Sequence, residues 1–132
     1  MQPNIVIVDD DPLQLTIMSL FLKKAGFERL SLFDSPVEAL VYARRRAPDL
    51  VITDYNMPEL TGVQLLRRLH DIYPDLPAVV VSGSDIDFDY PQIYAVVQKG
   101  SEHYFPKLIA YVRSALNSKR EVGRQIKQSR FA

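Results

Sequence analysis

The stretch that decides the fold is Asp49-Leu50-Val51-Ile52-Thr53-Asp54-Tyr55-Asn56-Met57-Pro58. Its apolar part, Leu50 to Thr53, is rich in β-branched residues, which is typical of a strand buried on both faces of a parallel sheet. The run stops at the carboxylate of Asp54, and the asparagine and proline that follow predict an immediate turn. Open α/β sheets bind their ligands at the carboxyl ends of their strands. Asp54 is therefore the first candidate for chemistry.

The composition limits what the chain can be. With 132 residues, 47% of them apolar and 24% charged, we expect one ordinary globular domain. The absence of cysteine excludes disulfides, thiol catalysis and cysteine metal sites. No apolar run approaches the ~20 residues of a membrane span, so we expect a cytoplasmic protein without a membrane partner.

The charge is zero in total but unevenly distributed. Residues 119–132 contain five basic residues and one acidic residue, a net charge of +4, so residues 1–118 carry −4. An acidic body with a basic tail gives no general case for direct nucleic-acid binding. We expect a domain over residues 1–118, followed over residues 119–132 by a basic helix extension or linker.

Strands and helices are predicted to alternate along the chain. Beside the strand that ends at Asp54, the pattern predicts four more strands, at 4–8, 29–33, 78–81 and 103–106. Capping sequences begin three helices, at Asp11-Pro12, Ser35-Pro36-Val37-Glu38 and Thr61-Gly62-Val63-Gln64. A short fourth helix is predicted at 93–98 and a last helix from Leu108. Five strands alternating with five helices predict a doubly wound parallel α/β sheet.

Several of these helices carry apolar residues at helical spacing. We expect the first helix to bury Leu13, Ile17, Leu20 and Phe21. We expect the last helix to bury Leu108, Ile109, Val112, Ala115 and Leu116.

Polar side chains follow several of the predicted strands at one edge of the sheet. Asp9 and Asp10 follow the first strand, Asp54 ends the third, Ser82 ends the fourth and Lys107 follows the fifth. Crowded carboxylates repel one another unless a cation lies between them, and an all-oxygen site suits Mg²⁺. A metal, a lysine and a hydroxyl around one carboxylate are the groups that hold a phosphoryl group during its transfer. Asp11 is different, because helix capping explains it fully.

Over residues 4 to about 118 the chain resembles the receiver domain of two-component response regulators. The resemblance depends on four motifs: Val6-Ile7-Val8-Asp9-Asp10-Asp11-Pro12, 49–58 with Gly62, Val79-Val80-Val81-Ser82-Gly83, and Gly100 through Tyr104 to Lys107. It implies a flavodoxin-like fold, a five-stranded parallel sheet (βα)5 with strand order 2-1-3-4-5.

The resemblance also implies the chemistry of the site. Asp54 looks like the phosphoacceptor, which takes a phosphoryl group from a sensor histidine kinase or a histidine phosphotransfer protein. Asp9 and Asp10 look like the pair that holds Mg²⁺, together with Asp54 and the backbone carbonyl of Asn56. Lys107 looks like the lysine that pairs with the phosphoryl oxygens. Such a domain is a signalling switch in a phosphorelay and catalyses only its own phosphorylation and dephosphorylation.

The switch itself is implied by two further residues. Ser82 looks like the hydroxyl that moves toward the phosphoryl group, and Tyr104 like the aromatic residue that turns inward behind it. The surface expected to change consists of the fourth helix, fifth strand and fifth helix, which would bind a downstream protein or a fused output domain. Homodimerisation through that surface is one state that the resemblance leaves open.

Other functions compete with this one. A Mg²⁺-dependent phosphatase of the haloacid dehalogenase type would use Asp9 as nucleophile and Asp11 as acid/base, but it leaves Asp54 idle. A receiver-like scaffold without phosphorylation is a second alternative, because Leu108 follows Lys107 where the family usually has proline. The stretch 83–90 is also longer than is usual in the family. A flavodoxin is disfavoured, since the first turn is acidic instead of a phosphate cradle.

Overall fold

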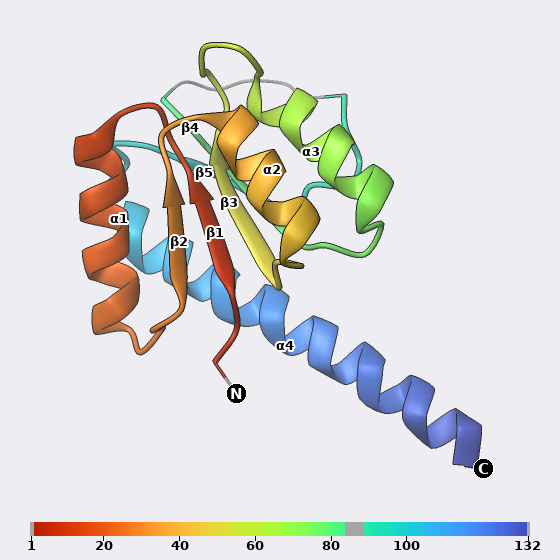
Figure 1. Cartoon of the computed structure of the whole chain (residues 1–132). Coiled ribbons are helices and arrows are strands. Elements are labelled where there is room, and N and C mark those ends of the chain that lie inside the picture. The colour runs from red at the N-terminus through yellow and green to blue at the C-terminus, as the bar shows by residue number, and fades with distance from the viewer. Residues whose placement is uncertain (1, 84–88, 132) are drawn as a thin grey trace.

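The computed structural model describes the backbone of residues 2–83 and 89–131, and side chains up to residue 119. Strands and helices alternate over its first two thirds (Figure 1). The elements are β1 (Ile5–Val8), α1 (Pro12–Lys24), β2 (Leu30–Phe33), α2 (Pro36–Arg45), β3 (Leu50–Asp54), α3 (Gly62–Ile72), β4 (Ala78–Ser82), β5 (Ala95–Gln98) and α4 (Tyr104–Phe131).

The five strands form one parallel sheet in the order β2-β1-β3-β4-β5, which confirms the predicted strand order. The strands β1, β3 and β4 lie inside the sheet and every residue in them is buried, as their uninterrupted apolar runs predict. The edge strands β2 and β5 are less buried. All five strands point the same way, so their carboxyl ends meet at one edge of the sheet.

Helices cover both faces of this sheet and make a three-layer sandwich. Figure 1 shows α2 and α3 on one face, and α1 with the first part of α4 on the other. Two apolar clusters fill the spaces between the layers: one contains Met18, Leu22, Leu108 and Val112 from α1 and α4, and the other contains Ala39, Leu40, Leu65 and Leu69 from α2 and α3. The last helix buries four of its five predicted residues fully, and Ile109 partly.

The predicted buried face of α1 is wrong. Leu13 and Leu20 are 64% and 60% exposed, whereas Leu15, Met18 and Leu22 lie in the core. Both sets of residues recur at helical spacing, so α1 is apolar on two faces and its sequence alone does not say which face meets the sheet. On the outer face, Phe21 stacks on Phe105 of α4 with ring centroids 3.9 Å apart.

The fifth strand is also not where the sequence predicts it. The stretch 93–98, predicted as a short helix, contains β5, and the stretch 103–106, predicted as a strand, contains the first turn of α4. The described residues therefore form four helices rather than five. Of the predicted long loop 83–90, residues 84–88 lie outside the described residues.

The last helix is much longer than the sheet needs. Among its side chains up to residue 119, the last buried one is Leu116, and its backbone continues to Phe131, past the predicted domain boundary at residue 118. In Figure 1 this C-terminal part extends away from the sheet. Within the described ranges, none of the helices combines the length and apolar character that a bilayer-spanning helix requires.

Candidate functional site

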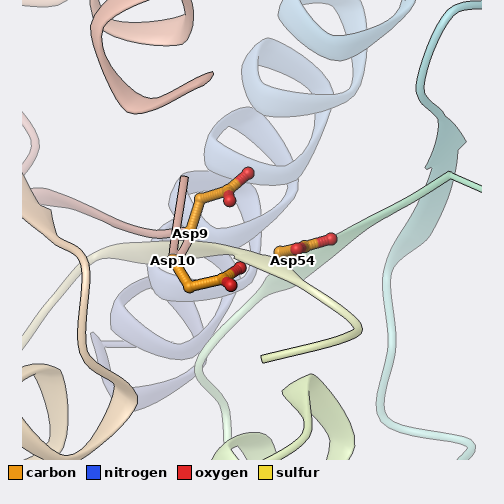
Figure 2. Close-up of side chains that lie close together, drawn as sticks. All are labelled: Asp9, Asp10 and Asp54. Atoms are coloured by element: carbon orange, nitrogen blue, oxygen red, sulfur yellow. The ribbon is translucent and has the colours of Figure 1, made fainter. Parts of the chain in front are cut away.

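Three carboxylates gather where β1 and β3 end. The two strands are paired in register, with Val8 beside Thr53, so the next residue of each strand, Asp9 and Asp54, reaches the same edge. Asp9, Asp10 and Asp54 each place a carboxylate oxygen within 4.8 Å of the others (Figure 2). Asp9 is fully buried and Asp54 is 8% exposed, whereas Asp10 is exposed. The predicted acidic cluster is therefore present in the structure.

The cation of the site is Lys99, which follows β5. Its Nζ lies 2.8 Å from Asp9 Oδ2, to which it donates a hydrogen bond, and 3.3 Å from Asp54 Oδ1. The backbone N–H of Lys99 donates to the carbonyl of Ser82, which fixes the residue beside β4. Burial by itself would lower the pKa of the Lys99 ammonium, but the hydrogen bond with Asp9 and the charges of Asp9 and Asp54 raise it above its ordinary value. Lys99 therefore stays charged between the two carboxylates.

Lys107 is placed differently. It is exposed on α4, one turn after the helix begins, because the stretch before it is helical instead of a strand. The prediction that Lys107 follows the fifth strand is therefore wrong. The sequence does carry a weak signal for Lys99, since a β-branched pair, Val96-Val97, precedes it and a turn-forming residue, Gly100, follows it.

The carboxylates at Asp54 and around it carry more negative charge than Lys99 neutralises. Burial, and next the charge of Asp9, raise the pKa of the Asp54 carboxyl above its ordinary value, although Lys99 and the N–H of Tyr55 act in the opposite direction. A carboxylate cluster with this excess of charge is a suitable ligand set for a hard divalent cation. Asp9, Asp10 and Asp54 are the residues that could hold one.

A tight turn holds the chain after Asp54. Thr61 caps α3 with a reciprocal capping box to Gln64, as the sequence predicts. The N–H of Gly62 donates to the carbonyl of Tyr55 at 2.8 Å. A Cβ at position 62 would lie 2.4 Å from the carbonyl oxygen of Asp54, so only glycine lets α3 begin this close to the site. Asn56 lies in this turn and its side chain is exposed.

The two predicted switch residues lie on different elements. Ser82 is buried at the end of β4, next to the strand that carries Asp54. Tyr104 is the first residue of α4, not part of a strand, and its ring is buried against the core. The prediction places Tyr104 on the fifth strand and is wrong in that respect.

The chain resembles known proteins over most of its length. Residues 5–114 match the family described as the response regulator receiver domain. Response regulator GtcR of Aneurinibacillus migulanus is 35% identical over 67% of this chain and 36% of its own length. The C4-dicarboxylate transport transcriptional regulatory protein DctD of Rhizobium meliloti is 31% identical over 89% of this chain and 25% of its own length. The chain thus spans roughly a quarter to a third of these two relatives.

Solved structures match over almost their whole length. The signal receiver domain of an HD domain-containing protein from Pseudomonas fluorescens Pf-5 superposes with a TM-score of 0.81 at 25% identity, covering 92% of this chain and 99% of that one. A CheY-like receiver domain protein from Methanospirillum hungatei has a TM-score of 0.82 at 20% identity, with 92% and 98% covered. At that identity the second match shows the fold alone.

Proposed function

The chain belongs to the response regulator receiver domain family, and on this premise we propose that Asp54 accepts a phosphoryl group from a histidine phosphodonor. The observation that carries the proposal is the position of Lys99, whose Nζ contacts Asp9 and Asp54 together. A lysine held between two carboxylates at the carboxyl edge of a parallel sheet has the charge to bind the oxygens of an incoming phosphoryl group.

The transfer is a displacement at phosphorus. An oxygen of Asp54 attacks, the bond between phosphorus and the donor imidazole nitrogen breaks, and that nitrogen keeps the electron pair and takes a proton. Lys99 pairs with the phosphoryl oxygens in place of Lys107, and Ser82 donates its hydroxyl to one of them. Asp9 and Asp10, with Asp54 and the carbonyl of Asn56, would hold Mg²⁺. When bound, Mg²⁺ would neutralise charge on the phosphoryl oxygens.

The output of the switch is a further part of the proposal. Phosphorylation adds negative charge beside Lys99 and Ser82. Lys99 directly follows β5, and its backbone N–H donates to the carbonyl of Ser82 at the end of β4, so a change at either residue reaches β5. The surface that responds is then β5 with α4, because no helix separates β4 from β5 in the described residues. We propose that it binds a downstream protein or a fused output domain, and that the phosphodonor is a cytoplasmic sensor kinase or phosphotransfer protein.

The phosphatase alternative has observations against it. Both oxygens of Asp9 are engaged, one by the N–H of Asp11 at 2.9 Å and the other by Lys99. The side chain of Asp11 accepts from the N–H of Leu13 and caps α1, so it faces the helix instead of a substrate. The departure that motivates the scaffold alternative remains with the new assignment, since Gly100, and not proline, follows Lys99.

Intact-mass spectrometry tests the proposal. Wild type and Asp54→Asn are incubated with Mg²⁺ and acetyl phosphate, a small phosphodonor. We expect one labile phosphoryl group on wild type and none on the variant. An adduct on both proteins would move the acceptor elsewhere, and no adduct with a range of donors would favour the scaffold. Continuous turnover of a generic phosphate ester would favour the phosphatase.

A further inference from the structure

Glu59 has a backbone conformation that a residue with a side chain rarely adopts. Its φ is 72°, and among the residues that the structure describes no other residue except glycine has a positive φ. The N–H of Leu60 donates to the carbonyl of Pro58 at 2.8 Å, so residues 58–60 form a three-residue turn with Glu59 at its centre. With a positive φ at its centre, such a turn is the rare and strained form. A strained residue of this kind needs a physical explanation.

The strained turn lies in the loop between the proposed acceptor and α3. This loop begins after Asp54 and is closed by the hydrogen bond from the N–H of Gly62 to the carbonyl of Tyr55. Asn56, whose carbonyl is assigned to Mg²⁺, lies three residues before Glu59 in the same loop. Since both ends of the loop are fixed, a change of conformation at Glu59 moves the chain that carries Asn56.

A side-chain contact ties Glu59 to the start of α2. The hydroxyl of Ser35 donates a hydrogen bond to Oε1 of Glu59 at 3.1 Å. The same hydroxyl oxygen accepts from the N–H of Glu38 at 3.3 Å and caps α2, so the hydroxyl is used both as donor and as acceptor. Ser35 is thereby fixed at a helix end, and its contact with Glu59 is anchored to the fold.

The contact joins the loops on both sides of the acidic site. Ser35 follows β2 and Glu59 follows β3, and β1, which leads to Asp9 and Asp10, lies between these two strands in the sheet. Glu59 is exposed, and its carboxylate does not belong to the described cluster of Asp9, Asp10 and Asp54. It is therefore placed to hold the loop of the metal site and is not assigned as a ligand.

We propose that Glu59 is a positioning residue, whose contact with Ser35 holds the strained loop 55–62 in the conformation that presents the carbonyl of Asn56 to Mg²⁺. The contact with Ser35 offsets the strain at Glu59 and orders the loop before the ion binds. This inference rests on the proposed function, because it concerns the metal site of that function. The role needs a side-chain oxygen at position 59 and not a charge, since an amide oxygen also accepts from a hydroxyl.

The test measures Mg²⁺ binding to the unphosphorylated protein, through the shifts of backbone amide resonances during a titration in about 0.15 M salt. We expect Glu59→Ala to bind Mg²⁺ about fivefold more weakly than wild type, the factor that corresponds to one hydrogen bond. Glu59→Gln keeps the oxygen that accepts from Ser35 and should stay within about twofold of wild type, since exposed charges are screened by salt. The matched control Glu38→Ala removes another exposed acidic side chain near Ser35 and should also stay within about twofold.

Two further variants separate positioning from stability. Glu59→Gly relieves the backbone strain and should have a higher urea midpoint than Glu59→Ala. It should nevertheless bind Mg²⁺ as weakly as Glu59→Ala, because both variants lack the contact with Ser35. In a Ser35→Ala background, Glu59→Ala should cause no further loss of Mg²⁺ affinity, since the partner is already absent. A residue that only stabilised the fold would show neither pattern.

The outcomes separate this role from the proposed function. If wild type binds Mg²⁺ and Glu59→Ala binds it equally well, the role of Glu59 is overturned and the proposed function stands. If Glu59→Gln binds as weakly as Glu59→Ala, the charge of Glu59 and not its contact with Ser35 determines the affinity, and the role is overturned in the same way. If wild type does not bind Mg²⁺, the metal site of the proposed function is overturned, and the role of Glu59 with it.

Discussion

Lys99 and Lys107 differ in what surrounds them, although both are lysines near the start of α4. Lys99 is partly buried and contacts two carboxylates, whereas Lys107 is exposed. We expect Lys99→Ala to slow phosphorylation of Asp54 by about ten- to a hundredfold, because a charge-assisted contact to the phosphoryl group is lost. Lys107→Ala is the matched control and should leave the rate unchanged. The measurement is the rate of mass gain with acetyl phosphate, on variants shown by thermal unfolding to be folded. Equal loss in both variants would contradict the assignment of Lys99.

The raised pKa of Asp54 has a consequence for stability without Mg²⁺. The folded protein holds the proton of Asp54 more tightly than the unfolded chain does, so this group stabilises the fold fully below its ordinary pKa of about 3.8, and that contribution is lost as the pH rises through the raised pKa. At neutral pH the charged carboxyl therefore destabilises the fold. We expect Asp54→Asn to unfold at a higher temperature than wild type at pH 7 in a chelator.

This advantage should shrink as the pH falls, because Asp54 in the folded wild type takes up its proton at a higher pH than an ordinary aspartate does. Thermal unfolding of both proteins between pH 4 and pH 8 measures it. A difference between the two proteins that is constant with pH, or that grows toward low pH, would contradict the raised pKa.

Sequence reasoning located the acidic part of the site and missed the basic part, for a physical reason. Asp9 and Asp54 follow strands whose residues are all buried, and such strands have an uninterrupted apolar pattern. Lys99 follows β5, in which Val97 alone is fully buried. An edge strand with one buried residue has only a weak pattern, here the pair Val96-Val97, so the sequence places the lysine of the site at residue 107, eight residues after Lys99.

At the scale of an element, the sequence predicts the ends of the helices better than the faces that they bury. The caps of α1, α2 and α3 were predicted, because a cap is a local interaction between neighbouring residues. The sequence does not predict which face of α1 is buried, because Leu20 and Leu22 are equally apolar and only the position of the sheet distinguishes them. The stretch 103–106 is predicted as a strand, but in the structure it contains the first turn of α4, and Phe105 packs on Phe21 of α1.

The close approach of α3 to the end of β3 gives a prediction for the turn between them. In Gly62→Ala the new Cβ would meet the carbonyl oxygen of Asp54, so the backbone must shift. We expect a loss of about 1 to 3 kcal/mol in the free energy of unfolding. Gly83→Ala is the control, because a Cβ there meets no atom within 4 Å, and we expect a change within about 0.5 kcal/mol. Urea unfolding measures both. An unchanged midpoint for Gly62→Ala would show that the turn adapts freely.

At the scale of the whole molecule, the backbone of α4 continues well past the last buried side chain that the structure describes. Leu108, Val112, Ala115 and Leu116 lie in the core, and the backbone continues for fifteen residues beyond Leu116. We propose that the domain ends near residue 118 and expect a chain of residues 1–118 to unfold cooperatively within a few degrees of the full chain. Differential scanning calorimetry of both chains tests this. Loss of the cooperative transition would show that residues 119–132 stabilise the domain.

The position of β1 in the middle of the sheet also determines when the molecule can assemble. Ile5 pairs with Leu30 on one side and with Leu50 on the other, so the first strand of this domain to be synthesised needs a partner made 45 residues later. Until β3 arrives, one edge of β1 is open, and its apolar residues are available to wrong partners. Contacts this distant in sequence slow folding, because the entropy of closing a long loop is lost before the contacts between its ends form. The same strand order that brings Asp9 beside Asp54 therefore delays formation of the core until β3 has been synthesised.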